Sequence, residues 1–217
     1  MATNDVQVEV IPATIAAPHD LTLRLECETV QQKTEDGQNH GTQKIYLFYV
    51  SRTTLTGLNH FKSMLAGSFS EANQDVVTLY DDHPKALKLL LQMLHGKHDK
   101  ETYDVTLETV WHLFQVALKR EIPPNALVDI AGKSWFEGWY ERHDANGFKY
   151  DDYRMLLYPC YTFDYASGFA AATKFLAYNG HRHITEKRPD GIENDKLRLH
   201  QGVIRKQSGV LPKLCAN

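Results

Sequence analysis

The 217-residue chain contains little cysteine, no long apolar run and no secretion signal. Its three cysteines, Cys27, Cys160 and Cys215, are odd in number and far apart, which argues against a disulfide framework. No apolar stretch approaches the ~18 residues that a membrane-spanning helix needs. The first residues, MATNDVQVEV, lack the basic start and apolar centre of a secretory signal. We therefore expect an intracellular protein, cytoplasmic or nuclear, with reduced thiols and no membrane partner.

Sequence patterns of catalysis and metal binding are also scarce. The chain has no phosphate-binding glycine-rich loop, no G-x-S-x-G turn and no H-E-x-x-H pair. Its closest histidine pair, His181 and His183, lacks the nearby cysteine or carboxylates that a zinc site would need. Cys160 lies close to Tyr158 and Tyr161, a setting typical of a buried and unreactive thiol. These patterns predict no catalytic residue, no cofactor and no metal; an enzyme would require a further ligand beside the histidine pair.

The net charge of −3 conceals an uneven distribution along the chain. Residues 171–217 carry nine lysines or arginines against four acidic residues, whereas the rest of the chain carries fifteen against twenty-three. A basic tail can bind an acidic partner or nucleic acid, but this excess is far from a polybasic run. We interpret the tail as a solvated surface that balances an acidic body, and expect no nucleic-acid partner.

Residues 45–80 show the clearest alternation of strand and helix patterns. Ile45–Val50 is an unbroken apolar run, short enough for a strand that is buried on both faces. Residues 54–65 carry apolar side chains close to a helical period, and a small polar loop follows at 66–75. Val76–Tyr80 is rich in β-branched residues and predicts a second strand.

Helices are expected after this second strand. The first begins near Asp82, whose side chain can cap it, and ends at Gly96. The next spans Leu107–Leu118, where apolar residues form one stripe. Pro124 then starts a further helix, and its large aromatic residues at helical spacing are expected in the core: Trp135 and Trp139.

Strands are also expected on the N-terminal side of Ile45. The segment VQVEVI, which begins at Val6, alternates apolar and polar residues, and Leu21–Leu25 does the same as a half-buried strand. The polar, glycine-bearing segment 27–43 then predicts a long hairpin loop.

The order and spacing of these elements resemble the BTB/POZ domain, in particular its many fungal members. The features that carry the resemblance are a strand, a helix with FKSML, a loop ending in SFSE, the strand VVTLYD, the helix HPKALKLLLQMLHG and a later segment KSWFEGWYERH. The resemblance implies an α/β (α+β) fold, with a small mixed β-sheet flanked by a helical cluster and followed by a C-terminal helical extension. It also implies a protein–protein interaction module without enzymatic activity.

The resemblance also implies a division of the chain into three parts. Residues 1–19 would form an N-terminal strand and link, and residues 20–142 the BTB/POZ domain. The helical extension would cover 145–217, with helices expected over 153–158 and 164–178 and mixed helix and coil from His181 on.

The loop after the FKSML helix is the candidate partner-binding site. In BTB proteins that bind cullins, this loop carries a hydrophobic residue, any residue and then glutamate, which here are Phe69, Ser70 and Glu71. An exposed aromatic side chain can fill a pocket while a nearby carboxylate accepts a charge-assisted hydrogen bond. The resemblance thus implies a substrate-recognition adaptor for a cullin-based ubiquitin ligase, with residues 145–217 holding the target. The alternative for Phe69 is a side chain packed into the core of its own domain.

Self-association, independent of ubiquitin, is the alternative function. An N-terminal segment is used for dimerisation in the BTB family, and Val6, Val8 and Val10 could serve here, with a second copy or with other BTB proteins. A nuclear, transcription-linked role is weakened by one departure from the family pattern. Family members with ligand and co-repressor grooves at their dimer interfaces often have an aspartate on the first strand and a histidine at the start of the next helix. This chain has Asp20 at the first position but Ser51 at the second.

Overall fold

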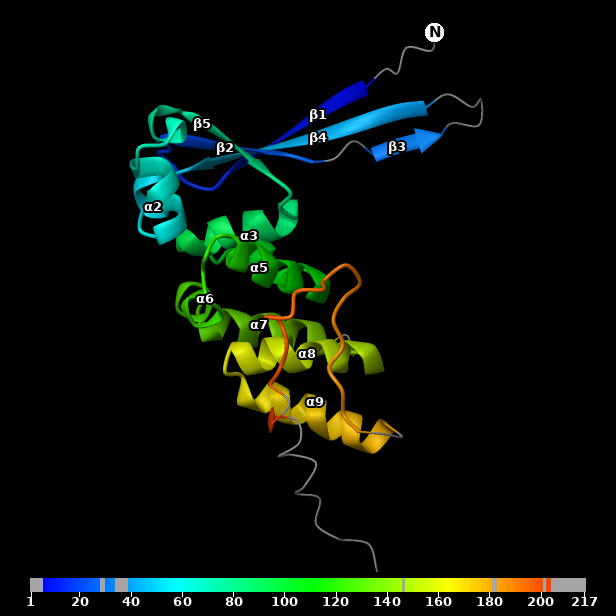
Figure 1. The fold of residues 1–217 in the computed structure, drawn as a ribbon. Helices are drawn as coiled ribbons and strands as arrows, with labels where there is room; N and C mark the ends of the chain where they lie inside the picture. Colours follow the sequence, from blue (N-terminus) through cyan, green and yellow to red (C-terminus); the bar gives the residue numbers. More distant parts are fainter. Residues whose placement is uncertain are drawn as a thin grey trace, which may run out of the picture. The chain divides into compact units, whose positions relative to one another are not determined.

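The computed structural model describes residues 6–27, 30–33, 39–145, 147–180, 183–200 and 202–203 (Figure 1). Over these residues the chain forms two compact units. The first comprises the described residues up to 97 together with 119–122, and the second comprises 98–118 and the described residues from 123 on. The domain boundaries implied by the BTB/POZ resemblance, at residues 20, 142 and 145, remain predictions.

The first unit is built on a mixed β-sheet (Figure 1). Its strands are β1 (Val6–Thr14), β2 (Leu21–Glu26), β3 (Val30–Lys33), β4 (Asn39–Val50) and β5 (Val76–Tyr80). The strand order is β1–β4–β2–β5, and β3 also pairs with β4. β1 runs parallel to β4 and β5 parallel to β2, whereas β2 and β3 run antiparallel to β4. The expected α/β class with a mixed sheet is therefore present.

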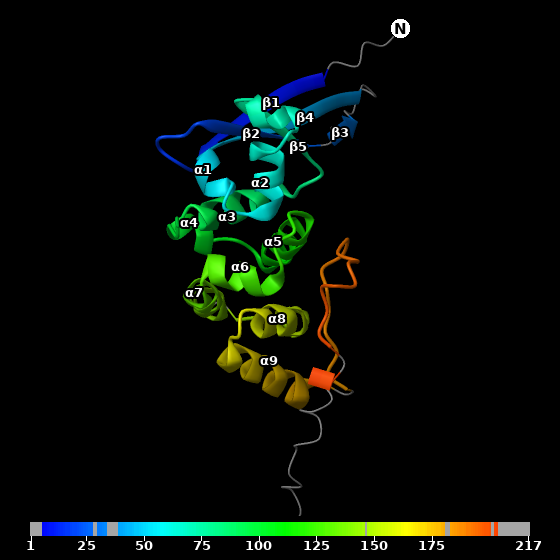
Figure 2. The same cartoon turned by 60° about the vertical axis from the view of Figure 1, so that its left-hand side comes forward.

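Side chains on the sheet alternate between the core and the opposite face. Leu21, Leu23 and Leu25 of β2 are buried while the residues between them are partly exposed, which confirms the half-buried strand. β4 does not follow its prediction, because Ile45 and Phe48 are buried but the intervening side chains are only half-buried. Phe48 lies on the same face of the sheet as its partner Leu23, whereas Ile45, three residues away, lies on the opposite face. Helices of the same unit cover only one face of the sheet (Figure 2), so the run is not buried throughout.

The expected hairpin loop at 27–43 is wrong in part. Residues 30–33 form β3, and β4 already begins at Asn39, so that the two strands pair antiparallel. Residues 28–29 and 34–38 lie outside the described part. The polar composition misled the prediction because strand formation depends on the available partner: the first half of β1 pairs with Gly41–Ile45 and extends the sheet.

The helices of the first unit are α1 (Arg52–Leu55), α2 (Asn59–Ala66) and α3 (Pro84–Leu94). The single helix expected over 54–65 is therefore wrong. The helical conformation is interrupted around Gly57, because glycine is unfavourable in helix interiors, and Leu58 has an extended backbone. The loop at 66–75 contains a 3₁₀ turn, η1 (Ser70–Asn73).

The start of α3 also differs from its prediction. Asp82 does not cap this helix; the cap is His83, whose Nδ1 accepts a hydrogen bond from the amide of Ala86 at 3.3 Å. Asp82 instead forms a buried ion pair with Arg120. At the other end, Gly96 follows the helix with φ +65°, in agreement with the expected stop.

The described elements of the second unit are helices. They are α4 (Lys100–Tyr103), α5 (Leu107–Lys119), α6 (Pro124–Ala131), α7 (Lys133–Asp144), α8 (Tyr150–Thr162) and α9 (Ala166–Asn179). The helix expected from Pro124 through Trp139 is split by Gly132, whose φ of +77° ends α6. Trp135 and Trp139 are buried, which confirms their place in the core.

Residues 183–200 belong to the second unit and form turns and irregular structure without a helix or strand. Thr185 accepts hydrogen bonds from the Arg154 guanidinium, and the Lys187 ammonium lies 2.6 Å from an Asp151 carboxylate oxygen. Its apolar side chains Ile192, Leu197 and Leu199 are buried. Of the histidine pair, His183 is exposed and His181 lies outside the described residues. No helix in the described part is long and apolar enough to cross a membrane.

Candidate partner-binding loop

The candidate loop connects α2 to β5 in the first unit. Phe69 directly precedes η1, and Ser70 and Glu71 form its first turn, so the three residues are neighbours on one short, ordered segment. The carbonyl of Phe69 accepts a hydrogen bond from the amide of Ala72 at 3.1 Å, and the carbonyl of Glu71 accepts one from Gln74 at 3.2 Å. The loop therefore has a defined backbone conformation.

The side chain of Phe69 points away from the core. Its surface is 60% exposed, whereas Phe61 and Leu65 of the preceding helix are buried. Burying a phenylalanine side chain is worth about 1.5–3 kcal/mol, so an ordered, exposed one leaves that free energy available for a partner. The alternative interpretation, in which Phe69 packs into its own core, is wrong.

The carboxylate of Glu71 has a partner inside the loop. The hydroxyl of Ser70 donates a hydrogen bond to Glu71 Oε2 at 3.0 Å, and the side chain of Glu71 is half-buried. Because this bond restricts the carboxylate, the loop presents an aromatic ring and an oriented negative charge close together. Such a pair suits a partner with an apolar pocket beside a hydrogen-bond donor.

A glycine sets the exit of the chain from α2. A Cβ atom on Gly67 would lie 2.3 Å from the carbonyl oxygen of Ser63, a backbone atom that cannot move aside alone. The loop can therefore turn sharply here only with glycine. Gly67 is not among the residues predicted to form the site, although a glycine two residues before the candidate aromatic side chain is a signal visible in the sequence.

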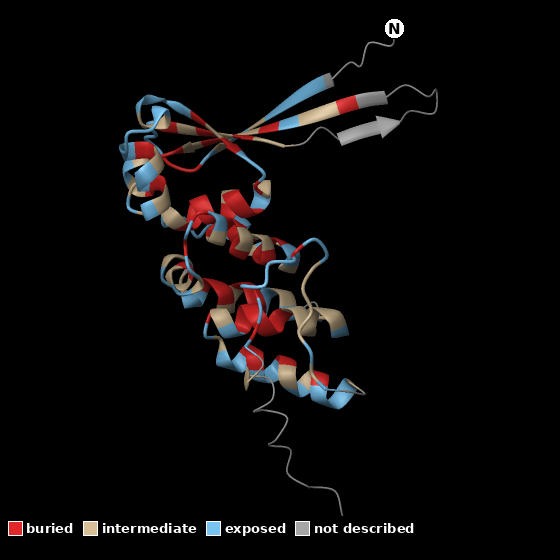
Figure 3. Ribbon diagram, viewed as in Figure 1, coloured by how far each residue is buried: buried red, intermediate tan, exposed pale blue. Residues whose placement is uncertain are grey.

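The candidate dimer segment lies on β1. Val8 and Val10 are 51% and 53% exposed, and β1 stands at one end of the strand order (Figure 3). The backbone of Val6 pairs with Gly41, but its side chain is outside the described residues. β1 thus presents apolar side chains on an edge strand, the usual place for strand addition.

Asp20 and Ser51, the two positions compared with the BTB family, have local contacts. Asp20 Oδ1 accepts a hydrogen bond from the amide of Arg52 at 2.7 Å. The hydroxyl of Ser51 caps α1, and the backbone amide of Ser51 donates a hydrogen bond to His95 Nε2 at 3.0 Å. Both residues therefore fix the start of α1.

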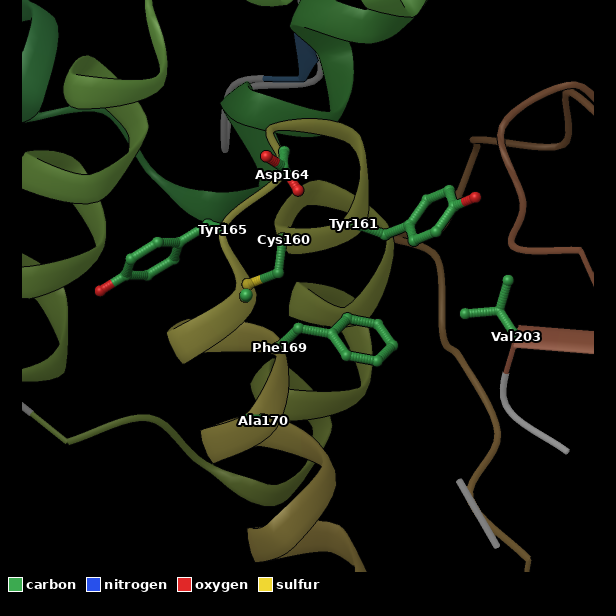
Figure 4. A pocket seen from close by; sticks show the side chains of 8 residues that line it. Cys160, Tyr161, Asp164, Tyr165, Phe169, Ala170 and Val203 are labelled. Carbon is green, nitrogen blue, oxygen red and sulfur yellow. The ribbon is translucent and has the colours of Figure 1, made fainter. Parts of the chain in front are cut away.

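A pocket of about 300 Å³ lies in the second unit, around the connection of α8 to α9 (Figure 4). Tyr161, Phe169 and Val203 contribute apolar side chains to its lining, and Cys160 also lines it. Cys160 is buried, and burial raises the pKa of its thiol, which keeps it protonated. The prediction of a buried thiol is confirmed. Within the described residues there is no group of three potential ligands that could hold a metal ion.

Comparisons with known proteins add no relative: no family model, curated protein or solved structure matches the chain. The mixed α/β architecture is established by the structure itself. Membership of the BTB/POZ family stays an expectation based on the order of the sequence elements.

Proposed function

We propose that the chain is a BTB/POZ-type protein–protein interaction module and acts as a substrate-recognition adaptor for a cullin-based ubiquitin ligase, without enzymatic activity of its own. One observation carries the proposal: Phe69 is ordered and 60% exposed in the loop whose pattern matches cullin-binding members. Ser70 supports it by orienting the carboxylate of Glu71.

The target protein would bind to the helical extension, residues 145–217. The pocket beside Cys160 supports this assignment, because a partly apolar depression can receive an apolar side chain of a bound protein (Figure 4). The exposed ring of Tyr161 at this pocket offers a further contact surface.

Replacing Phe69 and Glu71 together by alanine is expected to weaken cullin binding at least about 30-fold, because truncating a central contact residue costs about 2 kcal/mol or more. Isothermal titration against a panel of cullin N-terminal domains measures this loss. The matched control is Tyr178→Ala, which removes a 76% exposed aromatic ring from the second unit and should leave binding unchanged. A wild-type chain that binds no cullin, or a double variant that binds equally well, overturns the proposal.

The alternative function is self-association through β1, favoured by the exposed Val8 and Val10 on an edge strand. Lysine at both positions is expected to convert a dimer into a monomer, because charge on an edge strand opposes strand addition. Light scattering after size exclusion measures the mass. Val76→Lys, on β5 at the other end of the strand order, is the control and should leave the mass unchanged. A wild-type monomer at every concentration rules out this alternative.

A further inference from the structure

Arg52 connects the candidate loop to the sheet of the first unit. It is the first residue of α1, where Ser51 provides the cap. Its backbone amide donates to Asp20 Oδ1 at 2.7 Å, and Asp20 directly precedes β2. The backbone of Arg52 is thus held from two sides, so its side chain projects from a fixed point.

The guanidinium group of Arg52 reaches both ends of the loop that carries Phe69. Its Nη1 donates to the carbonyl of Leu65 at 3.3 Å and to the carbonyl of Ala72 at 3.1 Å. Its Nη2 donates to the carbonyl of Gln74. Leu65 lies in the last turn of α2, whereas Ala72 and Gln74 lie in and directly after η1. One planar group therefore joins the beginning and the end of the loop.

These three carbonyls are groups that the local backbone leaves without a helical partner. The last carbonyls of a helix have no intrahelical donor, and a positive charge near them is favourable. Arginine suits this task because it has five donors in a rigid plane, whereas lysine has one compact ammonium. The contacts are made to backbone atoms, so they constrain the loop and leave the side chains of Phe69 and Glu71 available.

We infer that Arg52 is a positioning residue, which holds the loop in the conformation that presents Phe69 and Glu71 to a partner. A loop that is already ordered loses less conformational entropy on binding, so the constraint raises affinity without touching the partner. The effect on affinity rests on the proposed function, whereas the effect on the loop itself does not.

Hydrogen exchange of the free chain tests the positioning role without a partner. In Arg52→Met, which keeps the apolar stem, the amides of Ala72 and Gln74 should exchange about tenfold faster, because the loop opens more often. Amides of β2 should be unchanged. Arg52→Lys keeps the positive charge but lacks the forked guanidinium, so its loop amides should exchange as fast as those of Arg52→Met. The same variant replaces Arg52→Met in the test if Arg52→Met does not fold. The control is Arg24→Met, which removes an arginine from the surface of β2.

Binding measurements then separate positioning from a loss of fold. Arg52→Met should weaken cullin binding about tenfold in the wild-type background and much less in Phe69→Ala, because the positioned ring is already gone. An equal loss in both backgrounds, or unchanged exchange of the loop amides, overturns the positioning role. If the loop amides of Arg52→Met exchange faster but the wild-type chain binds no cullin, the proposed function is overturned and the positioning role is not.

Discussion

Replacing Phe136 by alanine is expected to lower the free energy of unfolding of the second unit by about 3–5 kcal/mol. The ring of Phe136 is fully buried and stacks on Phe163, with centroids 4.6 Å apart and planes at 9°. The ring of Phe136 also stacks on Trp139, with centroids 5.5 Å apart, and forms a T-shaped pair with Tyr165, with centroids 6.1 Å apart. Large neighbours on several sides cannot collapse into the space, so the substitution leaves a cavity as well as losing apolar burial.

Urea unfolding followed by tryptophan fluorescence measures this loss. The three tryptophans of the chain, Trp111, Trp135 and Trp139, all belong to the second unit, so the signal reports that unit. Tyr178→Ala removes an exposed ring from the same unit and should change stability by less than about 0.5 kcal/mol. A loss below about 1 kcal/mol for Phe136→Ala would contradict the packed aromatic core.

Removing the arginine of the buried Asp82–Arg120 ion pair is expected to cost the first unit about 3–5 kcal/mol. The side chain of Asp82 is 0% exposed and that of Arg120 7%, and Arg120 Nη2 contacts Asp82 Oδ2 directly. Lys119 Nζ lies 3.3 Å from the other oxygen, an ion-pair contact without hydrogen-bond geometry. Burial and the neighbouring Arg120 lower the pKa of His60, whose neutral ring lies 3.3 Å from Arg120 Nη1.

Arg120→Met therefore leaves the Asp82 carboxylate buried with the exposed Lys119 as its remaining cation. An unmatched buried charge is costly, but replacing both partners by apolar residues of similar volume is often nearly neutral. The double variant Asp82→Leu with Arg120→Met should thus recover much of the lost stability.

Hydrogen exchange of the β2 and β5 amides measures this effect, because tryptophan fluorescence does not report the first unit. Arg24→Met is the matched control: its partner Glu26 is also partly exposed, and such surface pairs contribute about 0–1 kcal/mol. If Arg120→Met lowers the stability of the first unit no more than Arg24→Met does, the buried ion pair does not stabilise this unit.

Local pattern was sufficient for several elements of the fold. β2 was predictable because alternation with period two places Leu21, Leu23 and Leu25 on one face, and β5 because its β-branched residues favour a strand. Trp135 and Trp139 were predictable as core because their spacing puts them on one side of a helix. The positions of Phe69, Ser70 and Glu71 within one loop also follow from the sequence, although their role in binding stays a prediction.

Other features depended on residues far apart in the chain. The prediction that Asp82 caps α3 was wrong because its carboxylate forms an ion pair with Arg120, 38 residues away. The strands at 30–33 and 39–43 exist because β1 and β4 offer partners, which local composition does not encode. Likewise, Arg52 looks like an ordinary helix-start residue until the fold brings Leu65, Ala72 and Gln74 within reach of its guanidinium.

By itself, the sequence determined the α/β class, strands β2 and β5, helices α3 and α5, the burial of Trp135 and Trp139, and the position of the loop that carries the candidate site. Only the tertiary structure decided that Phe69 is exposed, which residue orders its loop and which carboxylate is buried. The physical reason is that periodicity is a short-range property of the chain, whereas exposure and ion pairing depend on what packs against each side chain.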